Sequence, residues 1–254
     1  MHVDAYGIEL PEGSDNLQHG FEYLANAIRR QGRKRLIGAT VHRHIDRLIH
    51  MWPTARFIRL IRDGRDVANS RVAMGWEGNA WSAAKVWVDE ERAWDACKTN
   101  LAADQYIEVH FEQLVANTEA ELARICDFLG VDYSSQMLSY PSDTTYSAID
   151  ASLAHQWQKR MPKRDLGWVQ SVQQDMLRRR GYALGPAAAQ APGPLAQILL
   201  RMHSRLAVAR FRMRRFGLQL WMWDFWIRHT GLASMTRRTA TAVAMEEIET
   251  KHGK

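Results

Sequence analysis

The feature that most constrains the fold is an apolar strand that runs directly into a helix, within the sequence ARFIRLIRDGRDVANS of residues 55–70. Residues 55–61 alternate little between apolar and polar, which predicts a strand buried on both faces. Arg62 stands at its carboxyl end, and Ser70 follows eight positions later, two turns into the helix. Parallel α/β sheets bind phosphorylated ligands at this edge, because strand ends and helix amino termini converge there. An arginine and a hydroxyl at these positions predict a phosphate site.

A structural alternative explains the same residues. In it, the strand–turn–helix carries only solvated charges, and Asp63 and Asp66 pair with Arg62 and Arg65. Taken by themselves, the residues leave both interpretations open.

Helical and extended patterns alternate along the first 130 residues, which predicts parallel βαβ units with right-handed crossovers. The expected helices begin with an amphipathic segment whose apolar residues recur at spacings of three and four. A Thr-Glu-Ala-Glu sequence at 118–121 predicts a capping box, and Gly130 a helix end. The expected elements are helices at 16–31, 43–52, from 66, at 81–101 and at 118–130, with strands at 34–41, 55–61 and 106–111.

Composition divides the chain into three parts. Residues 1–185 form the expected α/β domain, residues 186–194 are a linker rich in Pro, Gly and Ala, and residues 195–254 are a basic, amphipathic helical extension. Cationic and aromatic residues are mixed in the stretch 210–229, which suits a membrane surface or nucleic acid. Packing against the domain, or against a second copy through these helices, is the alternative.

Bulk properties set further bounds. The formal net charge is +6, which fits a polyanionic ligand. Cys97 and Cys126 lie in apolar helical patterns and predict buried free thiols in a reducing compartment. The amino terminus lacks the pattern of a secretory signal, and no apolar run is long enough to span a bilayer. We therefore expect a cytoplasmic protein, with attachment to a membrane surface as the alternative.

Three segments in the same order resemble one enzyme family. The segment 55–70 resembles the 3′-phosphate-binding motif of sulfotransferases that use 3′-phosphoadenosine 5′-phosphosulfate (PAPS). The run YIEVHFEQLVANTEAELARICDFLG at 106–130 and the run QWQKRMPKRDLGWVQSVQQDMLRRRGY at 156–182 resemble two later motifs of the same family. The chain is most similar to bacterial sulfotransferases of the group that includes the tyrosylprotein enzymes. The resemblance implies a P-loop-NTPase-like α/β fold, with a parallel sheet flanked by helices.

The resemblance also implies a reaction and a site. In it, Arg62 and Ser70 hold the 3′-phosphate, Lys159 or Arg160 adds a second cation, and Trp157 packs beside the adenine. For Trp157 and its neighbours an anchored helix end is the equal alternative. The partners implied are PAPS and an acceptor hydroxyl or amine that receives the sulfuryl group. No metal is implied, and no nucleic acid is expected.

A general base for the acceptor hydroxyl is harder to assign. His42 and His44 follow the expected strand 34–41, which would place them near the carboxyl edge of the sheet. A neutral imidazole there could accept the proton of the acceptor. The alternative is that both belong to a helix start rich in Arg and His.

The chain departs from the family pattern at the donor site. Sulfotransferases of this kind open with a strand and a PRSGTT-like loop whose amides hold the 5′-phosphosulfate, and no such loop occurs here. The family's Lys-Thr-Pro-like motif corresponds to residues 36–40, which read LIGAT. We therefore expect a chain that is truncated or has lost half of the donor site, and that is inactive by itself. The alternatives are a non-catalytic nucleotide-binding remnant that acts as an interaction module, and a basic binder of membranes or nucleic acid.

Overall fold

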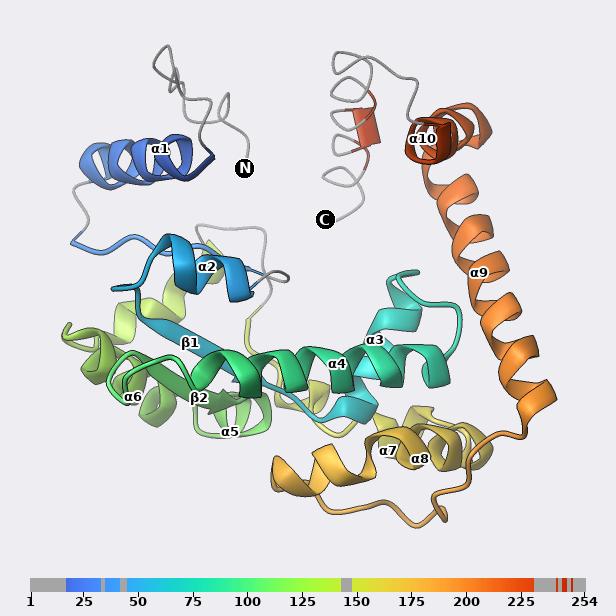
Figure 1. Ribbon diagram of the computed structural model, residues 1–254. Coiled ribbons are helices and arrows are strands. Elements are labelled where there is room, and N and C mark those ends of the chain that lie inside the picture. The colour runs from blue at the N-terminus through green and yellow to red at the C-terminus, as the bar shows by residue number, and fades with distance from the viewer. Residues whose placement is uncertain are drawn as a thin grey trace.

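The computed structural model describes residues 17–32, 35–41, 45–142 and 148–230, with residues 241, 244, 245 and 248. Within these ranges helices dominate, and two strands form one small sheet (Figure 1). In chain order the elements are α1 (Leu17–Gln31), α2 (Ile45–Met51), β1 (Phe57–Ile61), α3 (Gly64–Ala73), α4 (Ala80–Lys98), β2 (Tyr106–His110), α5 (Phe111–Ala116), α6 (Thr118–Leu129), the 3₁₀ turns η2 (Ser135–Ser142) and η3 (Ala151–Leu153), α7 (Trp157–Arg160), α8 (Lys163–Arg179), α9 (Pro194–Phe216) and α10 (Leu218–Thr230).

The sheet confirms the predicted parallel βαβ arrangement. β1 pairs with β2 in parallel, with Phe57 opposite Tyr106 and Ile61 opposite His110, and α3 and α4 form the crossover between them. α5 and α6 follow β2 and pack back against it. Because the strands are parallel and in this register, Arg62 and Phe111 meet at the carboxyl edge of the sheet.

Much of the core lies between helices. α4 packs against α3 and α8, and the short helix α7 packs against α3 (Figure 1). One cluster of buried side chains joins these four helices: Ala68, Ala83, Ala84, Trp157, Met161, Leu166 and Val169. At the start of α3, a Cβ added to Gly64 would lie 2.6 Å from the ring of Trp87 and 2.8 Å from Oε1 of Gln173. Glycine therefore allows α3 to approach α4 and α8 closely.

Two expectations about the sheet are wrong. Residues 35–41 form no strand and are exposed. β1 is not buried on both faces, since Ile58 and Leu60 are 46% and 48% exposed. An apolar strand indicates burial on both faces only when helices cover both sides of the sheet. Within the described ranges, no element covers the face on which Ile58 and Leu60 lie.

The helix at 118–130 is confirmed and begins at Thr118 as expected, although its N-cap differs from the prediction. Asn117 is the N-cap residue and makes no side-chain cap hydrogen bond, so the predicted capping box does not begin α6. The end is as predicted, because Gly130 adopts a left-handed conformation with φ of 71°.

The tail is helical from Pro194 to Thr230, as its pattern predicted. α9 stands at the outer side of α3 and α4 and is held there by the loop between them (Figure 1). Gly78 N donates to Ser204 Oγ at 2.9 Å, and Asn79 Nδ2 donates to the carbonyl oxygen of Leu200 at 2.8 Å. α10 then packs on α9, with an ion pair of 2.8 Å between Arg212 and Asp224. None of the helices that the structure describes is long and apolar enough to cross a membrane.

Candidate functional site

Arg62 lies at the carboxyl end of β1, between the last strand residue and the start of α3. Its guanidinium Cζ is 4.4 Å from the centroid of the Phe111 ring, and its Nη2 donates to the carbonyl oxygen of Leu153 at 2.7 Å. Its Nε is buried and has no hydrogen-bond partner. Arg62 therefore keeps hydrogen-bonding capacity at the sheet edge where α/β folds bind anions.

Asp63 pairs with Arg65 and leaves Arg62 without a carboxylate. Its Oδ1 accepts from Arg65 Nε at 2.9 Å, and its Oδ2 accepts from Arg65 Nη2 at 2.7 Å. Trp157 Nε1 donates to the same Oδ2 at 3.0 Å, and the Arg65 guanidinium lies 3.8 Å from the Trp157 ring centroid. Among the described residues Arg62 forms no salt bridge, so the structural alternative is confirmed for the Asp63–Arg65 pair and wrong for Arg62.

One face of α3, the helix that follows Arg62, carries three polar side chains. Asp66, Asn69 and Ser70 share this face because they are three and four residues apart. The Asp66 Oδ2 and Asn69 Nδ2 atoms are buried without hydrogen-bond partners, and the half-buried Ser70 hydroxyl has none within the described ranges. Native proteins rarely leave buried polar atoms unsatisfied, so this face indicates a place for a polar ligand.

Asp66 is the titratable group of this face. Burial raises the pKa of its carboxyl, and a hydrogen bond from the backbone N–H of Trp157 and the charge of Arg62 partly oppose that rise. In this hydrogen bond the Trp157 N–H donates to Asp66 Oδ1 at 2.6 Å. Ser70 was predicted from the sequence as a candidate site residue. Asn69 and Asp66, whose unsatisfied polar atoms lie on the same face of α3, were not. The spacing of three and four residues was the signal that could have found them.

A second polar cluster follows β2 and holds the carboxyl edge of the sheet together. Glu112 Oε1 accepts from the backbone N–H of Asp63 at 2.9 Å, and its Oε2 accepts from the Tyr182 hydroxyl at 2.7 Å. Tyr182 also lies 3.2 Å from Nδ1 of His110. Burial, with the hydrogen bond to Glu112, raises the pKa of Tyr182 well above its usual range. The hydrogen bond between Glu112 and Tyr182 thus joins the motif at 106–130 to the motif at 156–182.

Of the three nucleotide-binding residues expected in 156–182, the structure buries one and exposes two. Trp157 is 6% exposed, stacks on Arg65 and belongs to the core cluster, which favours the anchoring role. Lys159 and Arg160 are exposed on α7, which packs against α3, and neither has an ion-pair partner in the described part of the chain. Their contact with a nucleotide stays a prediction. His42 and His44 lie outside the described residues.

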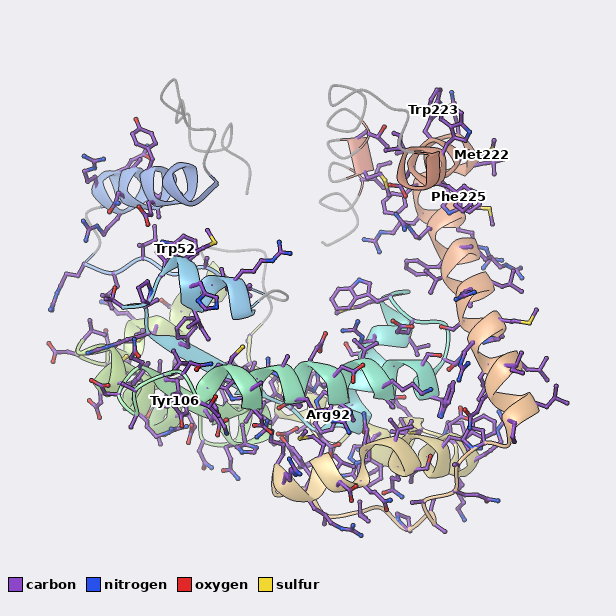
Figure 2. All side chains as sticks on the ribbon, viewed as in Figure 1. Trp52, Arg92, Tyr106, Met222, Trp223 and Phe225 are labelled. Atoms are coloured by element: carbon purple, nitrogen blue, oxygen red, sulfur yellow. The ribbon has the colours of Figure 1, made fainter. Side chains whose placement is uncertain are left out.

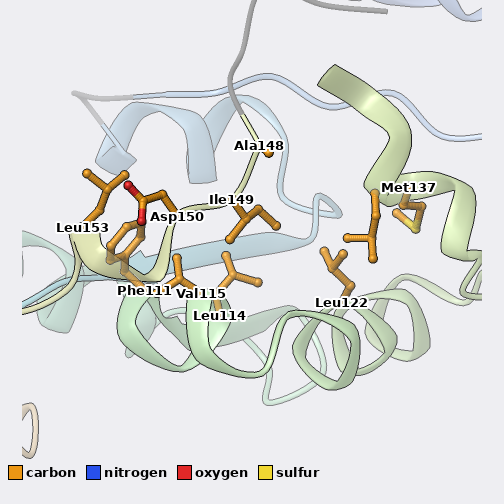
Figure 3. A pocket seen from close by; sticks show the side chains of 10 residues that line it. Phe111, Leu114, Val115, Leu122, Met137, Ala148, Ile149, Asp150 and Leu153 are labelled. Atoms are coloured by element: carbon orange, nitrogen blue, oxygen red, sulfur yellow. The ribbon is translucent and has the colours of Figure 1, made fainter. Parts of the chain in front are cut away.

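A pocket of about 380 Å³ adjoins Arg62 (Figure 3). Phe111 and Leu153, which both contact Arg62, form one end together with Asp150, whereas Leu122 and Met137 stand at the other end. The walls are otherwise apolar and come from α5, α6, η2 and the segment 148–153: Phe111, Leu114, Val115, Leu122, Met137, Leu138, Ala148, Ile149, Asp150 and Leu153. The site thus combines a cationic edge with an apolar hollow.

The loop between α3 and α4, at residues 74–79, does not line this pocket. A Cβ on Gly75 would lie 2.2 Å from the Phe211 ring, and Gly78 and Asn79 bond to α9. The loop therefore anchors α9, and an acceptor pocket formed by it is not supported.

Comparisons with known proteins agree with this geometry. The model of the sulfotransferase family matches residues 15–135, which include Arg62, Ser70 and Glu112. A putative protein-tyrosine sulfotransferase of Caenorhabditis briggsae is 32% identical over 95 residues, covering 35% of this chain and 34% of the relative. Protein-tyrosine sulfotransferase A of Caenorhabditis elegans is 26% identical over 163 residues, covering 53% of this chain and 41% of the relative. The chain thus spans well under half the length of these curated relatives.

Solved structures show the same fold. The sulfotransferase domain of the Synechococcus PCC 7002 olefin synthase matches with a TM-score of 0.51 and 23% identity, over 66% of this chain and 65% of that one. The sulfotransferase domain of the curacin biosynthetic pathway matches with a TM-score of 0.52 and 19% identity, over 66% of this chain and 69% of that one. The strand-end arginine, the Ser70 spacing, the family match and the fold agree: over residues 15–135 the chain is similar to the sulfotransferase family, and its fold is that of sulfotransferase domains.

Proposed function

We propose that this chain carries the 3′-phosphate half of a PAPS site in a protein that transfers a sulfuryl group to an acceptor hydroxyl or amine. The single observation that carries the proposal is Arg62, a strand-end arginine with no carboxylate partner among the described residues and a buried Nε without a hydrogen bond. Asp63, the neighbouring acid, is already used by Arg65. An arginine kept free in this way is suited to a ligand anion.

The residues present fit a phosphate group. Arg62, just before α3, offers a charged donor, and Asn69 and Ser70, in the second turn of α3, offer a buried amide donor and a hydroxyl. The backbone N–H groups of the first turn of α3 add positive potential at the same place. When bound, PAPS would supply the sulfuryl group that is transferred.

The role of this chain in catalysis is positioning. The buried pair of Asp63 and Arg65 fixes the turn after β1, so the side chain of Arg62 starts from a rigid backbone. A phosphate held by Arg62 and Ser70 would fix the register of the whole nucleotide, and correct positioning accounts for a large part of rate acceleration in group transfer. Lys159 and Arg160 on α7 are the proposed additional cations.

The proposed acceptor follows from the relatives. Those from both nematodes are named for protein tyrosine, so a tyrosine hydroxyl in a peptide is the acceptor to test first. The apolar pocket beside Arg62 has a size that suits an aromatic or aliphatic group.

Calorimetric titration with adenosine 3′,5′-bisphosphate tests the proposed grip. We expect weak binding to the parent chain and a loss of about tenfold or more in Arg62→Ala, because losing a charged hydrogen-bond partner costs about 1.5–3 kcal/mol. Ser70→Ala should cost less, since its bond is neutral. Adenosine 5′-phosphate, which lacks the 3′-phosphate, should bind the parent no better than the bisphosphate binds Arg62→Ala.

Arg56 offers a matched control. It lies just before the amino end of β1 and makes the same two kinds of contact as Arg62. Its Nη1 donates to the carbonyl oxygen of Phe128 at 2.6 Å, and its Cζ lies 5.6 Å from the Phe128 ring. Arg56→Ala should leave nucleotide affinity unchanged. Equal affinities of the parent and Arg62→Ala, or equal losses in both alanine variants, would remove the basis of the proposal.

A further inference from the structure

α9 exposes a continuous apolar stripe. Its members are three or four residues apart, so they lie on one face of the helix, and each is between 52% and 70% exposed. They are Leu195, Ile198, Leu199, Met202 and Leu206. The stripe rises about 17 Å along the helix, at 1.5 Å per residue. A contiguous apolar surface of this kind marks a binding face rather than a scatter of single residues.

The opposite side of α9 is the one that packs on the domain. Ser204 is buried and accepts from the Gly78 N–H, and the carbonyl oxygen of Leu200 accepts from Asn79. Figure 1 shows α9 at the outside of the molecule, with its far side turned away from α3 and α4. The stripe is therefore not the surface that joins α9 to its own domain.

Arginines flank the stripe on both sides. At 100° per residue, Arg201 and Arg205 lie along one edge, whereas Arg210 and Arg214 lie along the other. All four are exposed, and none has an ion-pair partner within the part of the chain that the structure describes. α9 contains six arginines and no Asp or Glu. Long cationic side chains beside an apolar stripe can reach a charged surface while the stripe enters an apolar layer.

This charge distribution decides the type of partner. A second copy that met α9 stripe to stripe would bring arginine edges against arginine edges, with no acidic residue of α9 to neutralise them. Duplex nucleic acid would be contacted through arginine but would leave the apolar stripe uncovered. A bilayer surface with anionic headgroups satisfies both features, because it takes the stripe into the acyl boundary and the arginines at the headgroups.

We infer that the outer face of α9 docks this protein on an anionic lipid membrane, with the helix lying in the plane of the surface. α10 also exposes apolar side chains, since Leu218 and Met222 are 60% and 55% exposed. Figure 2 shows Met222 on α10. The attachment is peripheral, because none of the described helices is suited to span a bilayer. The inference does not depend on the proposed nucleotide site.

Co-sedimentation of the full 254-residue chain with lipid vesicles tests the inference. Vesicles of phosphatidylcholine alone are compared with vesicles in which about a third of the lipid is phosphatidylglycerol. We expect binding to the anionic vesicles, little binding to the neutral ones, and weaker binding as salt rises. The triple variant Leu195→Gln, Leu199→Gln, Leu206→Gln should lower binding by more than about a hundredfold. The double variant Arg201→Gln, Arg205→Gln should lower it by about fivefold per arginine, from about 1 kcal/mol each.

The control variant removes apolar surface elsewhere. Leu36→Gln with Ile37→Gln changes two side chains that are 47% and 42% exposed and lie far from α9 in the sequence, and it should bind as the parent does. Thermal unfolding should be alike in all variants, because every changed residue is exposed. Binding that is equal on neutral and anionic vesicles, or that is unaffected by the leucine changes, overturns the inference.

Other partners would give other results. A concentration-dependent dimer that the leucine variant dissolves, without vesicle binding, assigns the face to a second copy and overturns membrane docking. Binding to a DNA duplex that needs Arg201 and Arg205 but not the leucines, again without vesicle binding, overturns it in favour of nucleic acid.

Discussion

The first turns of α3 and the outer face of α9 depart from the usual distribution of side chains in opposite directions. Next to α3, polar atoms of Arg62, Asp66 and Asn69 are buried without hydrogen-bond partners. On α9, apolar side chains are exposed in a row. Folded proteins normally satisfy buried polar groups and cover apolar stripes, so each region indicates something that it binds. The groups left over differ: Arg62 and Asn69 offer hydrogen-bond donors that suit an anion, whereas α9 offers an apolar surface between cations.

The largest expected effect concerns catalysis, because the site proposed at α3 would hold only the 3′-phosphate half of the donor. The sequence contains no Gly/Ser/Thr-rich phosphosulfate loop after an apolar strand. Loss of one preorganised donor lowers a rate by about 10²–10³, and loss of several lowers it further. We expect negligible turnover of the 254-residue chain with radiolabelled PAPS and a broad panel of acceptors.

The same assay can contradict this expectation. Turnover that needs Arg62 and matches that of ordinary sulfotransferases would show that other residues replace the loop. If the gene encodes an upstream strand and loop, adding them should restore transfer, and Arg62→Ala in the longer chain should abolish it.

The second prediction compares the two regions by stability. Asp63→Ala leaves the guanidinium of Arg65 buried without its partner, which should cost about 3–5 kcal/mol in the free energy of unfolding. Leu199→Gln on the α9 stripe should change it by less than about 0.5 kcal/mol, because the side chain is exposed. Urea denaturation followed by circular dichroism measures both. Equal losses would mean that the α9 face is part of the packed core.

The third prediction uses the unsatisfied amide of Asn69. Asn69→Leu removes a buried donor that has no partner, so the free energy of unfolding should rise by about 1 kcal/mol. Affinity for adenosine 3′,5′-bisphosphate should fall in the same variant. A gain in stability with unchanged affinity would remove Asn69 from the site, while a loss of stability would indicate a partner for its amide.

The smallest effect is a pH dependence at Asp66. Burial raises the pKa of this carboxyl in the folded state, so its contribution to stability is full below the unfolded pKa of 3.8 and is lost as pH rises through the folded pKa. Asp66→Asn keeps an oxygen for the Trp157 N–H and cannot ionise. We expect a Tm higher than that of the parent at pH 8, by no more than about 2–4 °C, and a difference that shrinks towards pH 4. A difference that grows on acidification would contradict the raised pKa.

Local sequence patterns predicted most elements around the site. β1, α3, α4, β2 and α6 lie within a few residues of their expected bounds, because apolar periodicity and terminal residues act over short stretches of chain. For the same reason Arg62 follows the last residue of β1 and Ser70 lies on α3, as the sequence predicted. The strand at 34–41 was wrong because a short apolar run specifies a strand only when a sheet edge is there to pair with it.

The sequence by itself determined the strand, the helix that follows it and the order of the motifs, since each depends on neighbours within about ten residues. Only the tertiary structure decided that Asp63 pairs with Arg65, that Trp157 is an anchor, and that Arg62 forms no ion pair within the described residues. Trp157 reaches Asp63 across 94 positions of chain. The exposure of the α9 stripe was equally undetermined by its pattern, because an amphipathic helix has the same spacing whether its apolar face meets the core, a second copy or a membrane.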